Sequence, residues 1–181
     1  MRGDEPTYET PSFRRSDAFA AVAREVKAVR GGVGINEVHN FGKFNVTGRD
    51  ARAWLDRVMA GRVPKPGRIS LTPMLSPKGQ LIGDFTITCL DDVDFNLTAS
   101  YGSQAYHFRW FQKHQQDGVT MENISDTRTG FQIAGPRSRE VLGACTRADI
   151  SDMRFLDVRR VTVGMTDCIV QRLSYTGDLG Y

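Results

Sequence analysis

The chain has 181 residues, of which 40% are apolar and 25% charged, a composition typical of one ordinary globular domain and not of a disordered or fibrous protein. Its net charge of +3 comes from scattered basic residues, which excludes the basic patch of a nucleic-acid-binding protein. The first residues contain no apolar signal segment, and no window approaches the roughly 18 apolar residues of a membrane span, so we expect a soluble, cytoplasmic protein.

The first half of the chain alternates predicted helices and strands. Residues 16–30 begin at a possible Ser16 cap, repeat apolar residues at helical spacing and run into Gly31 and Gly32. We interpret these glycines as a helix end and not as a nucleotide-binding loop, because GxGxxG would need glycine where Glu37 stands. In order, there follow a predicted strand at 43–48, a helix at 49–61 and a strand at 68–72.

The second half contains two strands joined by a tight turn. The runs 81–90 and 94–100 are strand-like, and the sequence LDDVD between them predicts an antiparallel hairpin. Interleaved helices and hairpin-linked strands predict an α+β fold in one continuous domain, residues 1–181. The remaining predicted elements are a helix near 103–116, a strand at 130–135, a helix from GPRSREVL with Pro136 in its first turn, and a strand at 167–175.

Neither the cysteines nor the histidines predict a metal site. Cys89, Cys145 and Cys168 lie far apart without a CxxC pair, and we expect buried, reduced thiols. His107 and His114 could share a helix face but lack a third ligand, so we interpret them as core or solvated residues.

A carboxylate inside a predicted strand is harder to assign. In SPKGQLIGDFTITCL, residues 76–90, alternation places Asp84, Thr86 and Thr88 on one face and the apolar side chains on the other. Asp84 could be structural, with hydrogen bonds to nearby backbone. It could also be a lone carboxylate at the wall of a cleft, suited to hold an amine or a cationic intermediate. The pattern alone leaves both interpretations open.

A resemblance over nearly the whole chain favours the functional interpretation. The chain resembles the folate-binding T-protein family, the aminomethyltransferases of glycine cleavage, in five ordered segments: FxxVxxEVKAVRxGVGI at 19–35, FGKFNVTGRDA at 41–51, VPKPGRISLTPMLSPKGQLIGDFTITCL at 63–90, AGPRSREVL at 134–142, and QRLSYTGDLGY. The nearer likeness is to the folate domain of dimethylglycine and sarcosine dehydrogenases. The resemblance implies a T-protein-like fold, with α+β subdomains around a central opening that holds tetrahydrofolate.

The resemblance also implies roles for individual residues. Asp84 matches the family's catalytic aspartate, which lies against the reactive amine nitrogens of the folate, and Tyr175 matches an aromatic residue that lines the folate site. Four further positions match residues that contact the pterin region, namely Phe41, Leu71, Thr98 and Ser100.

The chain departs from the family pattern at several of these positions. Gly83-Asp84 stands where the family has an Asp-Asp pair, and the second Asp of the pair is the one retained, so the departures bear on the amine donor more than on the folate site. The other departures are Gly79-Gln80 for Gly-Gly, Ser76 for Asn, Glu37 for Asp and Ser100 for Asn.

The activity that the resemblance implies is tetrahydrofolate-dependent one-carbon transfer in glycine, dimethylglycine or sarcosine-type amine catabolism. A carboxylate can orient a folate amine, accept its proton and stabilise positive charge on the donor. The chain has no flavin fingerprint, so any oxidation of the donor would belong to a flavin dehydrogenase domain or subunit. Two alternatives stay open, a folate-dependent demethylase of O- or S-methyl donors and a non-catalytic folate-binding module.

The final residues predict that the family's fold is incomplete here. LSYTGDLGY stops one residue before the glutamate of a YTGxxG(F/Y)E motif, a residue expected to hydrogen-bond the pterin, and family members continue well beyond this point. We therefore expect the C-terminal part of the fold to be missing, and we expect weak folate binding and no turnover from the isolated chain.

Overall fold

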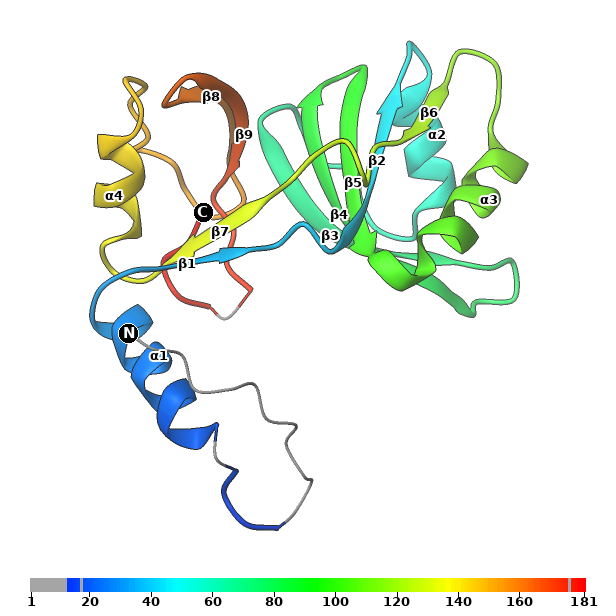
Figure 1. Ribbon diagram of the computed structural model, residues 1–181. Coiled ribbons are helices and arrows are strands. Elements are labelled where there is room, and N and C mark those ends of the chain that lie inside the picture. The colour runs from blue at the N-terminus through cyan, green and yellow to red at the C-terminus, as the bar shows by residue number, and fades with distance from the viewer. Residues whose placement is uncertain (1–12, 17, 176) are drawn as a thin grey trace.

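An antiparallel sheet of five strands, in the order β3–β4–β5–β2–β6, dominates the computed structural model, which describes residues 13–16, 18–175 and 177–181 (Figure 1). The predicted LDDVD turn joins β4 directly to β5, and Asp91 pairs with Asp94 across it, which confirms the hairpin. The strands are β2 (Phe41–Thr47), β3 (Arg68–Leu75), β4 (Leu81–Asp91), β5 (Asp94–Ser100) and β6 (Thr120–Asn123).

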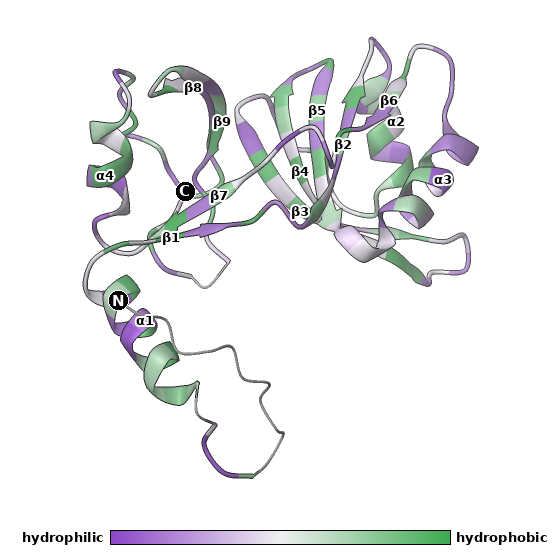
Figure 2. Cartoon of the chain, in the orientation of Figure 1, coloured by the Kyte–Doolittle hydropathy of each residue, from purple (hydrophilic) through white to green (hydrophobic). Residues whose placement is uncertain are grey.

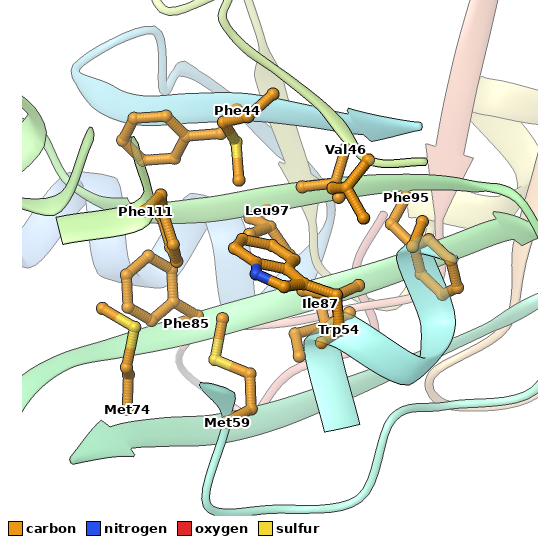
Figure 3. Packing of buried hydrophobic residues seen from close by; sticks show 14 of the residues in the cluster. Phe44, Val46, Trp54, Met59, Met74, Phe85, Ile87, Phe95, Leu97 and Phe111 are labelled. Atoms are coloured by element: carbon orange, nitrogen blue, oxygen red, sulfur yellow. The ribbon is translucent and has the colours of Figure 1, made fainter. Parts of the chain in front are cut away.

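Two helices cover one face of this sheet, the inner face, and enclose the main hydrophobic core (Figures 1 and 3). They are α2 (Ala51–Val58) and α3 (Gln104–His114). Trp54 and Phe111 are fully buried with ring centres 5.8 Å apart, and Figure 3 shows Trp54 at the centre of the cluster. The indole N–H of Trp54 donates to the His114 carbonyl at 2.7 Å, so its polar atom is satisfied inside the core.

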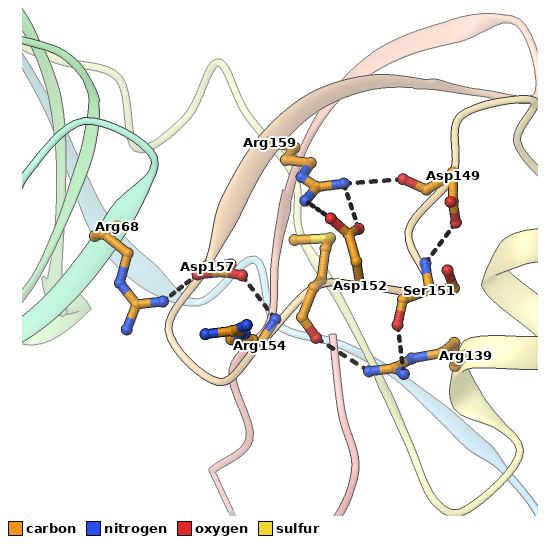
Figure 4. Close-up of polar contacts among 9 residues, drawn as sticks. Arg68, Arg139, Asp149, Ser151, Asp152, Arg154, Asp157 and Arg159 are labelled. Carbon is orange, nitrogen blue, oxygen red and sulfur yellow. Dashed lines mark hydrogen bonds and ion pairs between the residues drawn. The ribbon is translucent and has the colours of Figure 1, made fainter.

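A smaller group of elements lies beside the sheet and has its own hydrophobic cluster, which includes Met153, Val161 and Val170. The loop between α4 and β8 is held by a polar network (Figure 4). In it, Arg159 donates to both carboxylate oxygens of Asp152 at 2.7 Å each. The elements are a ribbon of β1 (Gly34–Glu37) and β7 (Phe131–Ala134), the helix α4 (Ser138–Ala144), and a hairpin of β8 (Val158–Val163) and β9 (Thr166–Gln171).

The β8–β9 hairpin docks on one end of the sheet's second face, the outer face. The backbone N–H of Val158 donates to the Gly67 carbonyl at 3.0 Å. The side-chain amide of Gln171 donates to the hydroxyl of Thr88 at 2.7 Å, and Thr88 is fully buried. An ion pair between Arg68 and Asp157 adds to this contact. The outer face is therefore covered where the hairpin lies.

Three expectations need correction. Helix α1 (Phe19–Gly31) ends where predicted, but its N-cap residue is Ala18, which makes no side-chain capping bond, and not Ser16; the Ser16 carbonyl accepts a hydrogen bond from the Phe19 N–H at 3.0 Å. Pro136 lies before α4 and not in its first turn, because the helix begins at Ser138. Of the cysteines, Cys89 is buried as expected, whereas Cys168 is half-buried and Cys145 is exposed. Cys145 directly follows α4 and Cys168 is on β9, both in the smaller group of elements.

Across the described residues, every helix falls short of the length and apolar character needed to cross a membrane.

Candidate functional site on the outer face of the sheet

Cross-strand pairing forms a row of side chains across the outer face. Leu71 pairs with Thr86, Thr86 with Thr98, and Thr98 with Lys43. Directly paired residues on neighbouring strands turn their side chains to the same side of a sheet. These four side chains, which we call the threonine row, therefore lie next to one another on β3, β4, β5 and β2.

A second row lies two residues further along each strand. Pro73 pairs with Asp84, and Phe41 pairs with Ser100. Asp84 and Ser100 each lie two residues from the paired threonines on adjacent strands, so the antiparallel register makes them neighbours as well. We call this second set the aspartate row. Five of the predicted site residues, Asp84, Phe41, Leu71, Thr98 and Ser100, are thus brought together from four strands.

The two rows are open, whereas the row beyond them is closed. Asp84 and Ser100 are exposed, and Leu71 keeps 68% of its surface accessible. Thr88, two residues along β4 from the threonine row, is buried under the β8–β9 hairpin. The hairpin covers only one end of the outer face, so polar and apolar side chains stay accessible at the other end.

The alternation predicted for β4 is confirmed. Phe85, Ile87 and Cys89 are buried on the inner face, while Asp84 lies on the outer face. Figure 2 shows the same alternation of hydrophobic and hydrophilic residues along β4 and β5. The position of Asp84 therefore follows from the pleat of a half-buried strand.

Gly83 does not belong to the outer face. A Cβ atom added to it would lie 2.4 Å from Nε2 of His107, a buried residue of α3. Position 83 consequently points to the inner face, away from the Asp84 carboxylate. The difference from the family's Asp-Asp pair is thus located on the core side of the strand.

Tyr175 is not part of the strands that carry the two rows. It lies on the segment after β9, and the residue is 88% exposed. Within the described residues, no hydrogen bond or ring contact joins Tyr175 to a member of either row. Its role in a folate site stays a prediction.

Lys43 is a member of the threonine row that the sequence interpretation missed. Its ammonium group donates to the carbonyl oxygens of His39 at 2.6 Å and of Phe41 at 3.1 Å. Burial lowers the pKa of Lys43, and the nearby Asp126 carboxylate opposes this effect. Alternation along KFNVTG could have placed Lys43 on the polar face, but only the pairing with Thr98 shows that it joins the site.

A polar cleft borders the aspartate row. It measures about 630 Å³, and it adjoins the row because Asn40 precedes Phe41 and Tyr101 follows Ser100 in the chain. Another cavity, of about 650 Å³, lies near the end of α4 and contains no member of either row. The polar cleft is lined by Glu37, His39, Asn40, Tyr101, Ser125, Asp126, Thr127, Arg128 and Thr129.

Comparison with known proteins shows which proteins this chain is similar to. The chain is 34% identical over 180 residues to the mitochondrial dimethylglycine dehydrogenase of Homo sapiens, covering 97% of this chain and 21% of that protein. It is 26% identical over 165 residues to an aminomethyltransferase of Desulforamulus reducens, covering 90% of this chain and 45% of that protein. The chain therefore spans from about a fifth to less than half of the length of these curated relatives.

Two solved structures share the fold. The glycine cleavage system aminomethyltransferase T from Bartonella henselae superimposes with a TM-score of 0.78 at 20% identity, covering 88% of this chain and 43% of that one. A chain of the heterotetrameric sarcosine oxidase from Corynebacterium sp. U-96 gives a TM-score of 0.62 at 20% identity, covering 93% of this chain and 85% of that one. These likenesses confirm the predicted T-protein-like α+β fold. Residues 4–181 match the family model described as the GCVT N-terminal domain, and the chain belongs to that family.

Proposed function

We propose that this chain binds tetrahydrofolate on the open part of its outer face and that Asp84 serves in the transfer of a one-carbon unit to the bound folate. The observation that carries the proposal is the juxtaposition of Asp84, Phe41, Leu71, Thr98 and Ser100 in two adjacent rows. Membership of a family that includes aminomethyltransferases supports it.

The side chains of the two rows suit a flat, polar heterocycle. Leu71 offers accessible apolar surface on which a ring can lie, and Phe41 adds an aromatic side chain at the other edge. Between them, the hydroxyl groups of Thr98 and Ser100 can donate or accept hydrogen bonds. Apolar walls with a few convergent polar groups are characteristic of small-molecule sites.

The chemistry assigned to Asp84 is proton transfer and charge stabilisation. Tetrahydrofolate, when bound, supplies amine nitrogens that capture the one-carbon unit. A carboxylate at hydrogen-bond distance can orient such an N–H group and accept its proton as the nitrogen–carbon bond forms. The same carboxylate stabilises positive charge on the incoming donor. Asp84 lies exposed on the open face, where a substrate can reach it.

We infer that the donor is an oxidised N-methyl amine, made by a flavin dehydrogenase domain or subunit. The dimethylglycine dehydrogenase and sarcosine oxidase likenesses support this inference. A flavin there would accept the hydride lost from the N-methyl group, and the folate would supply two amine nitrogens that take up the methylene carbon in place of the donor nitrogen. Asp84 would accept the proton of the attacking folate N–H group and return it to the donor nitrogen as the bond between that nitrogen and the transferred carbon breaks.

The test combines tetrahydrofolate binding with transfer in two matched variants, made in a protein extended by the C-terminal part of the family's fold, because we expect no turnover from residues 1–181 alone. Asp84→Asn keeps the size and most hydrogen bonds of the side chain, and transfer should slow by about 10²-fold, the usual scale for a lost proton-transfer group. Asp56→Asn, on the exposed side of α2, should match the wild type. Calorimetric titration with tetrahydrofolate should saturate for all three proteins.

Two results would contradict the proposal in different ways. A titration of the wild type without saturable heat would show that the outer face does not bind tetrahydrofolate. Saturable binding with equal transfer rates for Asp84→Asn and Asp56→Asn would show that the face binds folate but that Asp84 takes no part in the chemistry.

A further inference from the structure

The strand that carries Asp84 contains a β-bulge close to it. Met74 pairs with Gly83, but the next pair joins Leu75 to Leu81, so Ile82 is an extra residue without a partner on β3. Bulges bend a strand and change the direction of nearby side chains, and they occur often next to functional sites. The bulged residue lies only two positions before Asp84.

His107 binds the bulge from the inner side of the sheet. The imidazole is 2% exposed, and its Nε2 lies 3.1 Å from the carbonyl oxygen of Ile82. Its ring centre lies 4.9 Å from that of Phe85, the residue after Asp84. One buried side chain of α3 therefore contacts β4 on both sides of Asp84.

The hydrogen bond fixes the protonation of His107. A carbonyl oxygen only accepts, so Nε2 must carry the proton that is donated to Ile82. Nδ1 is buried and has no partner among the described residues, which fits an unprotonated nitrogen. The imidazole is thus neutral, and its N–H satisfies the carbonyl of the bulged residue, which has no register partner on β3.

Gly83 provides the space for this contact. A Cβ atom at position 83 would lie 2.4 Å from Nε2 and 2.9 Å from Cε1 of His107, far inside contact distance. A side chain at position 83 would therefore require the imidazole at position 107 to move. The two residues form one structural unit with the bulge.

We propose that His107 is a positioning residue, which locks the bulge at Ile82 through its hydrogen bond and so fixes the direction of the Asp84 carboxylate on the opposite face. The inference rests on the proposed role of Asp84 in one-carbon transfer. Residues of this kind act by geometry, since a misplacement of about 1 Å can cost on the order of 10²-fold in rate.

The test uses three substitutions on the same helix, with transfer measured in the same extended protein as for Asp84→Asn. His107→Phe keeps an aromatic ring but removes the donor, and His107→Gln keeps a neutral N–H donor. His114→Phe is the matched control, because His114 is a partly buried histidine of α3 whose described ring contact is with Trp110 of the same helix, and its buried Nε2 has no hydrogen-bond partner among the described residues. We expect His107→Phe to lower the transfer kcat about tenfold with little change in the KM for tetrahydrofolate, and His107→Gln to restore most of the rate.

A double-mutant cycle separates positioning from a general loss of structure. In the Asp84→Asn background, His107→Phe should change the rate less than twofold, because the group that it positions is already absent. Equal effects of His107→Phe in both backgrounds would overturn the proposal.

A measurement without folate distinguishes a failure of this inference from a failure of the proposed function. Hydrogen exchange at the backbone amides of residues 82–84 should be faster in His107→Phe than in the wild type, and unchanged in His114→Phe. If exchange at these amides is the same in all three proteins, His107 does not hold the bulge, whatever the folate experiments show. If exchange responds but the wild type does not bind tetrahydrofolate, the proposed function fails and the structural link remains.

Discussion

His107 links the protonation of one side chain to the stability of the whole chain. Burial lowers its pKa from the ordinary 6.5, and the hydrogen bond to the Ile82 carbonyl opposes this effect only in part. The groups that face its ring are neutral: the Ile82 carbonyl and Phe85 on β4, and Tyr106 on its own helix. Protonation would place a second N–H group and a charge at the buried Nδ1, where the described residues offer no acceptor.

The sign of the resulting pH dependence follows from proton linkage. Between the lowered folded pKa and 6.5, the unfolded chain binds more protons than the folded chain, so the free energy of unfolding rises with pH in this window. Acidification from neutral pH toward about pH 5 should therefore destabilise the protein. His107→Gln does not titrate, and its stability should depend less on pH there. Urea denaturation at several pH values gives the free energy of unfolding of the wild type and of His107→Gln. If this free energy depends on pH in the same way in both proteins, His107 is not the source of the pH dependence.

The helices differ in how much the fold depends on them. Phe111 of α3 is fully buried and its ring contacts those of Phe44, Phe85 and Trp54 at centre distances of 5.4–5.8 Å. Helix α1 buries none of its residues, and its Phe19 is 48% exposed. The core of the sheet should therefore be sensitive to changes in α3 and insensitive to changes in α1.

Two truncations of the same residue type test this difference. Phe111→Ala should lower the free energy of unfolding by about 3–5 kcal/mol, the usual cost of removing a buried aromatic ring. Phe19→Ala should stay within about 0.5 kcal/mol of the wild type, as expected for an exposed position. Chemical denaturation followed by tryptophan fluorescence gives both values, because Trp54 lies in the same core. Similar losses for the two variants would show that α1 packs more tightly than its exposure indicates.

The strands show which elements sequence patterns can reveal. The runs that became β2, β3, β4 and β5 alternate or contain clear apolar residues, and each was predicted. β1, β6 and β8 were missed. β1 and β6 have four residues each and are mostly exposed, so they carry little periodic signal. In β8, Arg159 and Arg160 interrupt the apolar pattern, and their charges are paired with Asp152 and Asp94 by tertiary contacts.

At the scale of the whole molecule, the β8–β9 hairpin decides which part of the outer face is open. Its side-chain contact with the sheet includes the hydrogen bond from Gln171 to the buried hydroxyl of Thr88. Removal of this amide leaves a buried hydroxyl without that partner. The docking of the hairpin should therefore be measurably sensitive to Gln171.

Gln171→Ala should lower the free energy of unfolding by about 1–3 kcal/mol, the cost of leaving a buried polar group unsatisfied. It should also increase hydrogen exchange in β8 and β9 more than in β2 and β5. Gln80→Ala, in an exposed turn, is the control and should change neither quantity. Unchanged exchange in the hairpin of Gln171→Ala would show that backbone contacts alone hold it in place.

The sequence by itself determined the local features of the site. Alternation along β4 turned Asp84 away from the apolar residues, and the short LDDVD turn fixed β4 next to β5, because both properties depend on residues close together in the chain. Tertiary structure alone decided the rest. Phe41 reaches Ser100 only because β2 inserts beside β5, a pairing stabilised by the burial of Phe44 and Leu97 under α2 and α3. Likewise, the bulge at Ile82 meets His107 only when α3 packs on the sheet. Such contacts join residues far apart in sequence, and their stability comes from shared burial that no single segment displays.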